Sequence, residues 1–246
     1  MRGLRPAVTL FVSDLHLDPA DPAIARQFHD FLAGEARDAD ALYILGDLFE
    51  AWLGDDDPDP AARAVVADLR ALVDSGVPCF VMHGNRDFLI GERFCRETGA
   101  TLLPDGAVVE LYGERAVLMH GDALCTDDAS YQRLRRIVRN PVVRGLFRLM
   151  TLNQRRALAA RLRAGSRAHV GMTAPEVMDV NAEAVQLAFR EAGVRTMIHG
   201  HTHRPAVHPL EIDGAPAKRI VLGDWYTQGS VLEVSAGGFE LRVLPR

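Results

Sequence analysis

The sequence predicts an α/β fold in which helices pack on a parallel or mixed sheet. Short apolar runs recur along the chain, and each is followed by polar or glycine-rich residues and then by a segment with helical periodicity. This alternation is typical of a sheet with helices on its faces. The composition agrees, since 48% of the 246 residues are hydrophobic and 25% are charged, as in one large domain or a domain with an insertion.

In the first half of the chain, three strands alternate with three helices. Apolar runs predict the strands at residues 8–13, 41–45 and 78–82. Helical spacing of apolar residues predicts helices at residues 22–36, 60–75 and 91–98. The acidic run DDDPDP, residues 55–60, is expected to be a solvated loop.

The second half begins with a predicted hairpin, residues 108–112 and 115–120, that turns through Gly113. Helical patterns follow at residues 129–167 and 175–191, and a strand pattern follows at residues 195–199. The chain is expected to end in three strands, with a candidate fourth, at residues 206–212, 218–223, 230–234 and 239–243.

Neither cysteine usage nor hydropathy indicates secretion or a membrane span. Cys79, Cys95 and Cys125 are odd in number and have no paired spacing, which predicts reduced thiols in a cytosolic protein. The apolar run 7–12 is too short for a signal peptide or a span, and no other stretch approaches ~18 uninterrupted apolar residues.

Charge is distributed unevenly. The net charge is −5, yet residues 129–175 contain no acid and eleven arginines, which leaves 17 basic residues against 33 acidic ones elsewhere, or −16. Leucine, valine and isoleucine alternate with these arginines. Such helices can pack apolar faces around acyl chains while the arginines face an anionic lipid surface. Nucleic-acid binding and a plain solvated helical face are the alternatives, and few aromatics and an acidic body disfavour nucleic acid.

Five predicted strand ends carry side chains that can bind metal ions: Asp14, His16, Asp47, Asn85, His120, His201 and His203. All of them follow apolar runs, and open α/β sheets place their sites at the carboxyl ends of strands. If the extended conformation persists there, Asp14 and His16 point to one face, and so do His201 and His203. Any one of these residues alone could be a cap, a turn residue or a hydrogen-bonded core residue. Together they favour a metal centre.

This set offers three oxygens and four imidazoles and no cysteine, which suits Mn²⁺ or Fe²⁺, with Zn²⁺ as an alternative. Two divalent ions ~3.5–4 Å apart, joined by a carboxylate, clamp both the attacking and the leaving oxygen of a displacement at phosphorus. The other histidines are less suggestive. We expect His83 to support the site, and His29, His169 and His208 to be surface or packing residues.

The order Asp-x-His, Gly-Asp, Gly-Asn, His-Gly, Gly-His-x-His resembles the calcineurin-like metallophosphoesterase superfamily. The resemblance implies an αββα fold, a two-sheet sandwich flanked by helices. It implies one metal held by Asp14, His16, Asp47 and His203. It implies a second metal held by Asp47, as the bridging residue, with Asn85, His120 and His201.

Longer motifs resemble the branch of this superfamily that acts in lipid A biosynthesis: SDLHL, LGDLFEAWLGDD, GNRDFLIG, HGDALCTDDASYQ, VMDVN, IHGHTHRPAVH and GDWYTQGS. This resemblance implies two Mn²⁺ ions and hydrolysis of UDP-2,3-diacylglucosamine to 2,3-diacylglucosamine 1-phosphate and UMP. It also implies substrate contacts by Asn85, Arg86, Asp128, Ser166 and His201. The sequence departs from the family pattern at Val170 and Thr173, where Asn and Lys are usual, and Arg167 and His169 are the neighbouring candidates to compensate.

Arg86 follows Asn85, where many metallophosphoesterases have a histidine. An arginine cannot be a general acid, because its pKa lies above ~12. A phosphate leaving group needs no proton, since its second pKa is ~6. Arg86 can instead neutralise charge on phosphoryl oxygens with two parallel donors, which favours a diphosphate substrate over an alkyl phosphodiester. The alternative is that Arg86 only pairs with Asp87 or another acid.

Taken together, the residues predict a single domain over residues 1–246 with a helical, lipid-binding cap inserted at residues 125–170. Water is expected to attack the α-phosphorus of UDP-2,3-diacylglucosamine, with Asn85 and Arg86 as catalytic residues. The protein is expected at the cytoplasmic face of the inner membrane as a peripheral protein that binds no nucleic acid. A pyrophosphatase for a soluble nucleotide-sugar and a non-catalytic scaffold are the alternatives.

Overall fold

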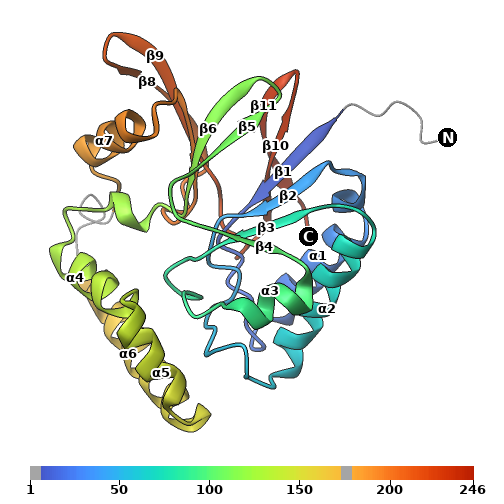
Figure 1. Ribbon diagram of the computed structural model, residues 1–246, viewed down its shortest axis with the longest axis vertical. Helices are drawn as coiled ribbons and strands as arrows, with labels where there is room; N and C mark the ends of the chain where they lie inside the picture. The colour runs from blue at the N-terminus through green and yellow to red at the C-terminus, as the bar shows by residue number, and fades with distance from the viewer. Residues whose placement is uncertain (1–6, 173–178) are drawn as a thin grey trace.

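Two β-sheets lie face to face with helices on both outer faces, as a computed structural model shows (Figure 1). The structure describes residues 7–172 and 179–246, without the side chains of residues 164–172. The expected αββα sandwich is confirmed. Among the described residues, no helix is both long and apolar enough to cross a bilayer.

The first sheet has six strands in the order β11-β10-β1-β2-β3-β4. Its parallel half contains β1 (Val8–Val12), β2 (Ala41–Ile44), β3 (Cys79–Met82) and β4 (Thr101–Leu103). The chain closes the sheet with β10 (Gly229–Ser235), antiparallel to β1, and β11 (Gly238–Leu244). The candidate fourth terminal strand is therefore present. The short strand β4 was not predicted.

The second sheet has five strands in the order β5-β6-β7-β9-β8. The predicted hairpin is confirmed as β5 (Ala107–Leu111) and β6 (Glu114–Met119). Strand β7 (Thr196–His199) lies parallel to both β6 and β9 (Ala215–Val221), and β8 (Ala206–Ile212) forms the far edge. The carboxyl ends of β6 and β7 therefore lie side by side, as do those of β1, β2 and β3.

Three hydrophobic clusters separate four layers. One lies between the first sheet and helices α1 (Pro22–Ala33), α2 (Pro60–Asp74) and α3 (Glu92–Thr98). The second fills the space between the sheets and includes Phe11, Leu118 and Ile198. The third joins the second sheet to α7 (Ala182–Ala192) through Val185 and Phe189.

Capping residues determine where several helices start, and some helix bounds differ from the predicted ones. Asp21 and Asp59 accept backbone N–H groups as N-caps in front of prolines at the first helical turn. Helix α1 ends at Ala33, and a separate 3₁₀ turn follows at Glu35–Asp38. Asn181 caps α7, so the predicted helix over residues 175–191 begins only at Ala182; residues 175–178 lie outside the described residues.

The arginine-rich segment forms three helices, α4 (Ala129–Val138), α5 (Pro141–Leu149) and α6 (Leu152–Met172). They project from the body as an arm beside the carboxyl ends of the strands (Figure 1). We call α4, α5 and α6 the insertion. Neither α4 nor α5 has a fully buried residue. The insertion therefore has little apolar core of its own.

Ion pairs attach the insertion to the body. Arg135 contacts Asp105 and Asp122, each at 2.8 Å, and Arg139 contacts Asp122 at 3.0 Å. Arg155, only 4% exposed, donates to both carboxylate oxygens of Asp56. The acidic body and the basic insertion therefore neutralise each other in part, and these arginines do not face a lipid surface as expected.

The acidic run at residues 55–60 is a loop that is partly exposed, as predicted, but its aspartates have specific partners. Asp55 accepts the Nε1–H of Trp52 and the backbone N–H groups of Gly91, Arg93 and Phe94 at the start of α3. In the same run, Asp56 and Asp57 pair with Arg155 and Arg156, and Asp59 caps α2. The run connects two helices of the body to the insertion.

Candidate metal centre

The predicted ligands follow five different strands and come together where these strands end. Asp14 follows β1, Asp47 follows β2 and Asn85 follows β3 of the first sheet. His120 follows β6, and His201 and His203 follow β7 of the second sheet. The centre therefore lies where the carboxyl ends of two sheets meet, in agreement with the strand-end argument.

The backbone there is not extended, which corrects the reason given for the Asp-x-His and His-x-His pairs. Asp14, His16, Asp47, His201 and His203 have left-handed backbones, with φ angles of 54°, 50°, 51°, 72° and 54°. Non-glycine residues rarely adopt this conformation, and where they do they are often found at functional sites. Each strand thus turns sharply at its end, and the side chains converge because of these turns rather than because of alternation along a strand.

Two glycines allow the backbone to lie close to the carboxylates of Asp47 and Asp14. A Cβ atom on Gly84 would lie 2.0 Å from Asp47 Oδ1, and one on Gly200 would lie 2.2 Å from Asp14 Oδ2. Any side chain at either position would displace a carboxylate of the centre. The glycines in the GN and HGH motifs are therefore required by space around the ligands.

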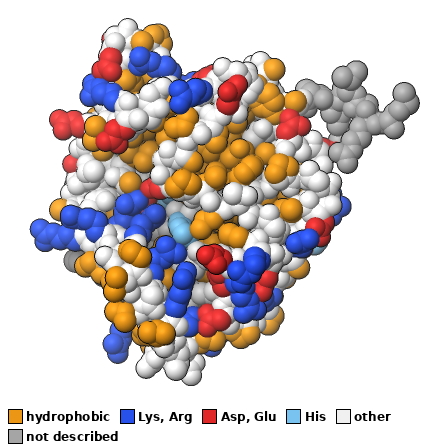
Figure 2. All heavy atoms as spheres, in the orientation of Figure 1, with side chains coloured by type: hydrophobic (Ala, Val, Ile, Leu, Met, Phe, Trp, Pro, Cys, Tyr) orange, Lys and Arg blue, Asp and Glu red, His pale blue; other side chains and the backbone are white. Residues whose placement is uncertain are grey.

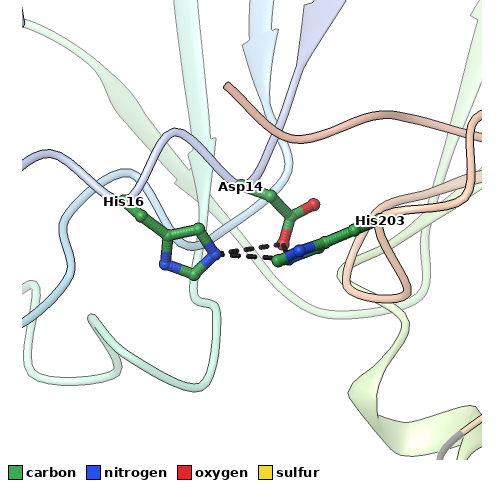
Figure 3. Close-up of side chains that lie close together, drawn as sticks. All are labelled: Asp14, His16 and His203. Atoms are coloured by element: carbon green, nitrogen blue, oxygen red, sulfur yellow. Dashed lines mark hydrogen bonds and ion pairs between the residues drawn. The ribbon is translucent and has the colours of Figure 1, made fainter. Parts of the chain in front are cut away.

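Asp14, His16 and His203 form the first group of ligand atoms (Figure 3). His203 Nε2 lies 3.3 Å from Asp14 Oδ1 and 3.3 Å from His16 Nε2, and His16 Nε2 lies 3.9 Å from Asp14 Oδ1. Asp14 Oδ2 accepts the Ser13 hydroxyl and the His201 backbone N–H. Asp14 Oδ1, by contrast, is buried without a hydrogen-bond partner among the described atoms.

Asp47, Asp14 and His120 form a second group of ligand atoms, and Asp47 also faces His16 of the first group. Its Oδ2 is 3.8 Å from His16 Nε2, and its Oδ1 is 3.7 Å from His120 Nε2. His120 donates from Nδ1 to the carbonyl of Leu45, so Nε2 faces the centre, where Asn85 Oδ1 lies 3.0 Å away. The ring of His201 packs edge-on against His120 with centroids 5.1 Å apart.

These residues fit divalent metal ions. Asp14 Oδ1 is an orphaned buried oxygen, imidazole nitrogens converge on it and on Asp47, and neither ligand group includes a cysteine. A mixed oxygen and nitrogen donor set of this kind suits Mn²⁺, Fe²⁺ or Zn²⁺. Asp47 presents one oxygen toward each imidazole group, as a bridging ligand would.

The electrostatics of the centre favour a cation. Burial alone would lower the pKa of His120, but the carboxylates of Asp47, Asp122 and Asp14 raise it to about 9. Burial alone would raise the pKa of Asp14, but the neighbouring histidines hold it well below its usual range. Burial and the charge of His120 lower the pKa of His201 to about 4, which keeps its imidazole neutral, the form that binds metals.

Carboxylates lie beside the outer nitrogens of two of the histidines. His16 Nδ1 lies 3.1 Å from Glu50 Oε2, and His203 Nδ1 lies 3.7 Å from Asp224 Oδ2, while each Nε2 faces the centre. Tyr226 stacks on His16 with an angle of 7° between the rings. Such partners fix the tautomer and orientation of metal-binding histidines. Sequence reasoning missed Glu50 and Asp224, although both stand inside motifs quoted above.

Two further buried groups around the centre were also missed. Asp122 accepts the Tyr131 hydroxyl and binds Arg135 and Arg139, so it connects the centre to the insertion. His199 is fully buried, and burial lowers its pKa to about 3; Arg219 lies 3.0 Å from its Nε2. In the sequence, both residues could have been noticed as polar residues next to apolar strand runs.

Arg86 lies beside the centre without a close carboxylate. Its backbone N–H donates to Asp47 Oδ1 at 2.8 Å, and its nearest carboxylate is Glu50, 3.9 Å from Nη1. Asp87 is fully buried and accepts the backbone N–H groups of Leu48 and Gly84 instead. Arg86 therefore does not pair with Asp87, and the acid that pairs with it is Glu50, at the limit of ion-pair distance.

The remaining predicted site residues lie in different surroundings. Asp128 caps α4 by accepting the backbone N–H of Tyr131. Ser166 lies in α6, in the stretch whose side chains are outside the described residues. His83 does not support the centre: its Nε2 lies 2.7 Å from the carbonyl of Ile90, and burial lowers its pKa to about 4.

A mainly apolar cavity of about 340 Å³ lies beside the centre. Leu17, Phe49, Trp52 and Val65 contribute apolar wall, and Glu50, the partner of His16, also lines it. Arg156 and Arg163 of the insertion line it as well. The cavity is thus positioned between the body and the insertion, next to the ligand cluster.

Comparisons with known proteins agree with this architecture. The model of the family "calcineurin-like phosphoesterase" matches residues 7–205. The UDP-2,3-diacylglucosamine hydrolase of Salmonella arizonae is 56% identical over 237 residues, which cover 96% of this chain and 99% of that enzyme. The enzyme of the same name from Salmonella paratyphi B is 55% identical over the same shares.

Solved structures share the fold at much lower identity. Vacuolar Protein Sorting 29 from Cryptosporidium parvum superposes with a TM-score of 0.51 at 12% identity, covering 97% of this chain and 96% of that one. A novel archaeal phosphodiesterase gives a TM-score of 0.50 at 13% identity, covering 96% and 99%. At such identities the likeness shows the fold alone.

Proposed function

The chain belongs to the calcineurin-like phosphoesterase family, and from this we propose that it hydrolyses the diphosphate bond of UDP-2,3-diacylglucosamine in lipid A biosynthesis. The products would be 2,3-diacylglucosamine 1-phosphate and UMP. The identity of 56% with a hydrolase of that substrate, over nearly the whole of both chains, is the observation that carries the proposal. It disfavours both a scaffold and an enzyme for a soluble nucleotide-sugar.

We propose that two Mn²⁺ ions occupy the centre. Asp14, His16 and His203 would hold one, Asn85, His120 and His201 the other, and Asp47 would contact both. When bound, two such ions supply an activated water and positive charge on the reacting phosphoryl oxygens. The buried orphan Asp14 Oδ1 and the position of Asp47 between two imidazole groups support this assignment.

Arg86 would bind the oxygens of the diphosphate and stabilise the charge that develops as the bond to the leaving phosphate breaks. Its backbone N–H donates to Asp47, and among the described residues its guanidinium has one carboxylate within ion-pair distance, that of Glu50 at 3.9 Å. Because the sugar phosphate leaves as a stable anion, no general acid is needed. We propose water attack at the α-phosphorus, with the sugar 1-phosphate as the leaving group.

The insertion would bind lipid. We propose that the apolar cavity beside the centre receives an acyl chain, because it opens between Trp52 and Phe49 of the body and Arg156 and Arg163 of the insertion. Asp128 and Ser166 would then contact the sugar end of the substrate from the same insertion. Residues 125–170 would thus form a helical cap over the substrate.

The outer side of the insertion would lie on the cytoplasmic face of the inner membrane. Five exposed apolar residues lie on α4 and α5; we call them the apolar stripe: Leu134, Ile137, Val142, Leu146 and Leu149. Leu149 is 83% exposed and Val142 is 68% exposed, although such side chains are usually covered in a soluble protein. Membrane contact would thus come mainly from this stripe and less from the arginines, several of which pair with the body.

Hydrolysis in ¹⁸O-labelled water tests the reaction. With purified protein, Mn²⁺ and UDP-2,3-diacylglucosamine, we expect label in UMP and none in 2,3-diacylglucosamine 1-phosphate, as measured by mass spectrometry of both products. Label in the sugar phosphate would mean attack at the other phosphorus and would reverse the assignment of Arg86. Turnover of UDP-glucose at a similar rate would instead indicate a nucleotide-sugar pyrophosphatase.

Replacing Leu146 and Leu149 by Ser should weaken binding to liposomes by at least about tenfold, because each leucine loses ~1.5–3 kcal/mol of transfer from water. Flotation with liposomes that contain anionic lipid measures the fraction of protein bound. Val207→Ser is the control, since Val207 is 48% exposed on β8, away from the insertion. An equal loss of liposome binding in the control, or no loss in the double variant, would show that the apolar stripe does not contact the membrane.

A further inference from the structure

A second groove lies on the other side of the loop that carries Asn85 and Arg86, with a volume of about 570 Å³. Its walls come from the acidic run, from the start of α3 and from α5. None of the seven proposed metal ligands lines it, and neither does Arg86. Figure 2 shows arginine side chains gathered where the insertion meets the body, around a histidine. We call this cavity the arginine groove.

Most charges that line the arginine groove already have partners. The Asp55 carboxylate accepts Trp52 and the backbone of α3, and Asp56 binds Arg155 through both oxygens. Arg93 pairs with Glu97 and Arg96 with Glu92. Each acid of the groove therefore has a partner other than the arginines of α5, although the charge of Asp55 still acts on Arg144.

Arg144 and Arg148 of α5 differ from the others. Among the described residues, neither has a carboxylate within ion-pair distance. They are four residues apart and thus adjacent on one face of the helix, an arrangement of like charges that destabilises a helix. Arg144 Nε is buried without a hydrogen-bond partner among the described atoms, and only Nη2 reaches the carbonyl of Ile90, at 3.5 Å.

The surroundings hold these two guanidinium groups over the groove. A Cβ atom on Gly91 would lie 3.2 Å from Arg148 Nη2, so Arg148 lies directly over this glycine. Burial and the charges of Arg148 and Arg139 lower the pKa of Arg144. At 100° per residue, the two arginines lie on the side of α5 opposite Val142, Leu146 and Leu149 of the apolar stripe. Arg144 is half-buried on that side, where solvent screens its charge less, and Arg148 is exposed at the rim of the groove.

We propose that the arginine groove binds a phosphate-bearing anion through Arg144 and Arg148. Two planar guanidinium forks match the oxygens of a phosphomonoester, and a dianion neutralises two adjacent positive charges. The anion supplies the acceptor that Arg144 Nε lacks. This site is separate from the diphosphate site at the metal centre, and it belongs to a soluble phosphate compound or to a phospholipid headgroup, which share this chemistry.

Calorimetric titration with inorganic phosphate tests the site in the Mn²⁺-loaded, full-length protein. We expect Arg144→Gln with Arg148→Gln to weaken one phosphate-binding event by at least about tenfold, because two charge-assisted contacts are lost. Arg133→Gln with Arg136→Gln removes the same amount of charge from α4 and should change the affinity for phosphate little. Arg144→Lys with Arg148→Lys keeps the charge without the forks and should give an intermediate affinity, which separates recognition from misfolding.

Hydrolysis of bis-p-nitrophenyl phosphate should be unchanged in all three variants, since the groove does not include the metal centre. Flotation with phosphatidylcholine vesicles, with and without phosphatidic acid, identifies the source of the phosphate. A loss specific to phosphatidic acid in the Arg144 and Arg148 glutamine variant assigns a lipid headgroup, and no such loss assigns a soluble phosphate. Equal phosphate affinity in the wild type and that variant, or an equal loss in the α4 control, overturns the proposal.

Discussion

Replacing Asp47 by Asn is expected to lower turnover of UDP-2,3-diacylglucosamine by more than about 10³-fold. Asp47 directs one oxygen toward His16 and the other toward His120, so both proposed ions lose charge and geometry at once. Asparagine tolerates the left-handed backbone that Asp47 adopts, with φ of 51°, so the fold should survive. Initial rates at saturating substrate and Mn²⁺ measure the change, and circular dichroism checks the fold.

His203→Asn is the matched control, because His203 belongs to one ligand group only and also has a left-handed backbone. Its loss of turnover should be smaller and should be partly restored by excess Mn²⁺, whereas Asp47→Asn should not respond. Metal content measured by mass spectrometry should fall further in Asp47→Asn than in His203→Asn. Mild and equal effects of the two changes would contradict a shared bridging carboxylate.

Replacing Arg86 by Ala is expected to lower kcat by about 10²–10³-fold, the size of effect found when one donor to a developing anion is removed. The effect should fall on kcat more than on KM, because the charge that Arg86 stabilises grows as the diphosphate bond breaks. Arg86→Lys should recover only part of the rate, since a lysine cannot make two parallel bonds. Steady-state kinetics with UDP-2,3-diacylglucosamine provide both constants.

Arg190→Gln is the control for Arg86, because Arg190 is a half-exposed arginine of α7 that pairs with Asp213 on the far side of the second sheet. It should keep wild-type kcat and KM. If Arg86→Ala raised KM and left kcat unchanged, Arg86 would hold the substrate without acting in the bond-breaking step. The α-phosphorus assignment would then depend on the ¹⁸O result alone.

The sequence was sufficient to predict that the candidate ligands come together, because the pattern that identifies them is local. Each candidate ligand directly follows an apolar run, and parallel strands bring their carboxyl ends together whatever the details of packing. The expected extended backbone at Asp14 and His16 was wrong, because periodicity says nothing about a strand that turns sharply at its last residue. The orienting carboxylates were missed for a related reason: Glu50 is recognisable only once His16 is seen beside it.

Long-range charge pairing could not be predicted. Arg155 and Asp56 are 99 residues apart, and nothing in either segment identifies the partner of an arginine or an aspartate. Composition therefore suggested a solvated acidic loop and a separate basic arm that faces lipid. In the structure, ion pairs join the acidic loop to the basic arm. The apolar stripe is the part of that interpretation that remains, since Leu146 and Leu149 stay exposed after the insertion has docked.

The left-handed backbone at five of the proposed ligands has a consequence for engineering. Each such residue costs of the order of 1 kcal/mol relative to glycine, which adopts this conformation freely. Selection for heat resistance alone would therefore favour glycine at Asp14, His16, Asp47, His201 and His203. The resulting protein would keep its sheets and helices while losing its chemistry, so a thermal screen of this enzyme needs an activity screen beside it.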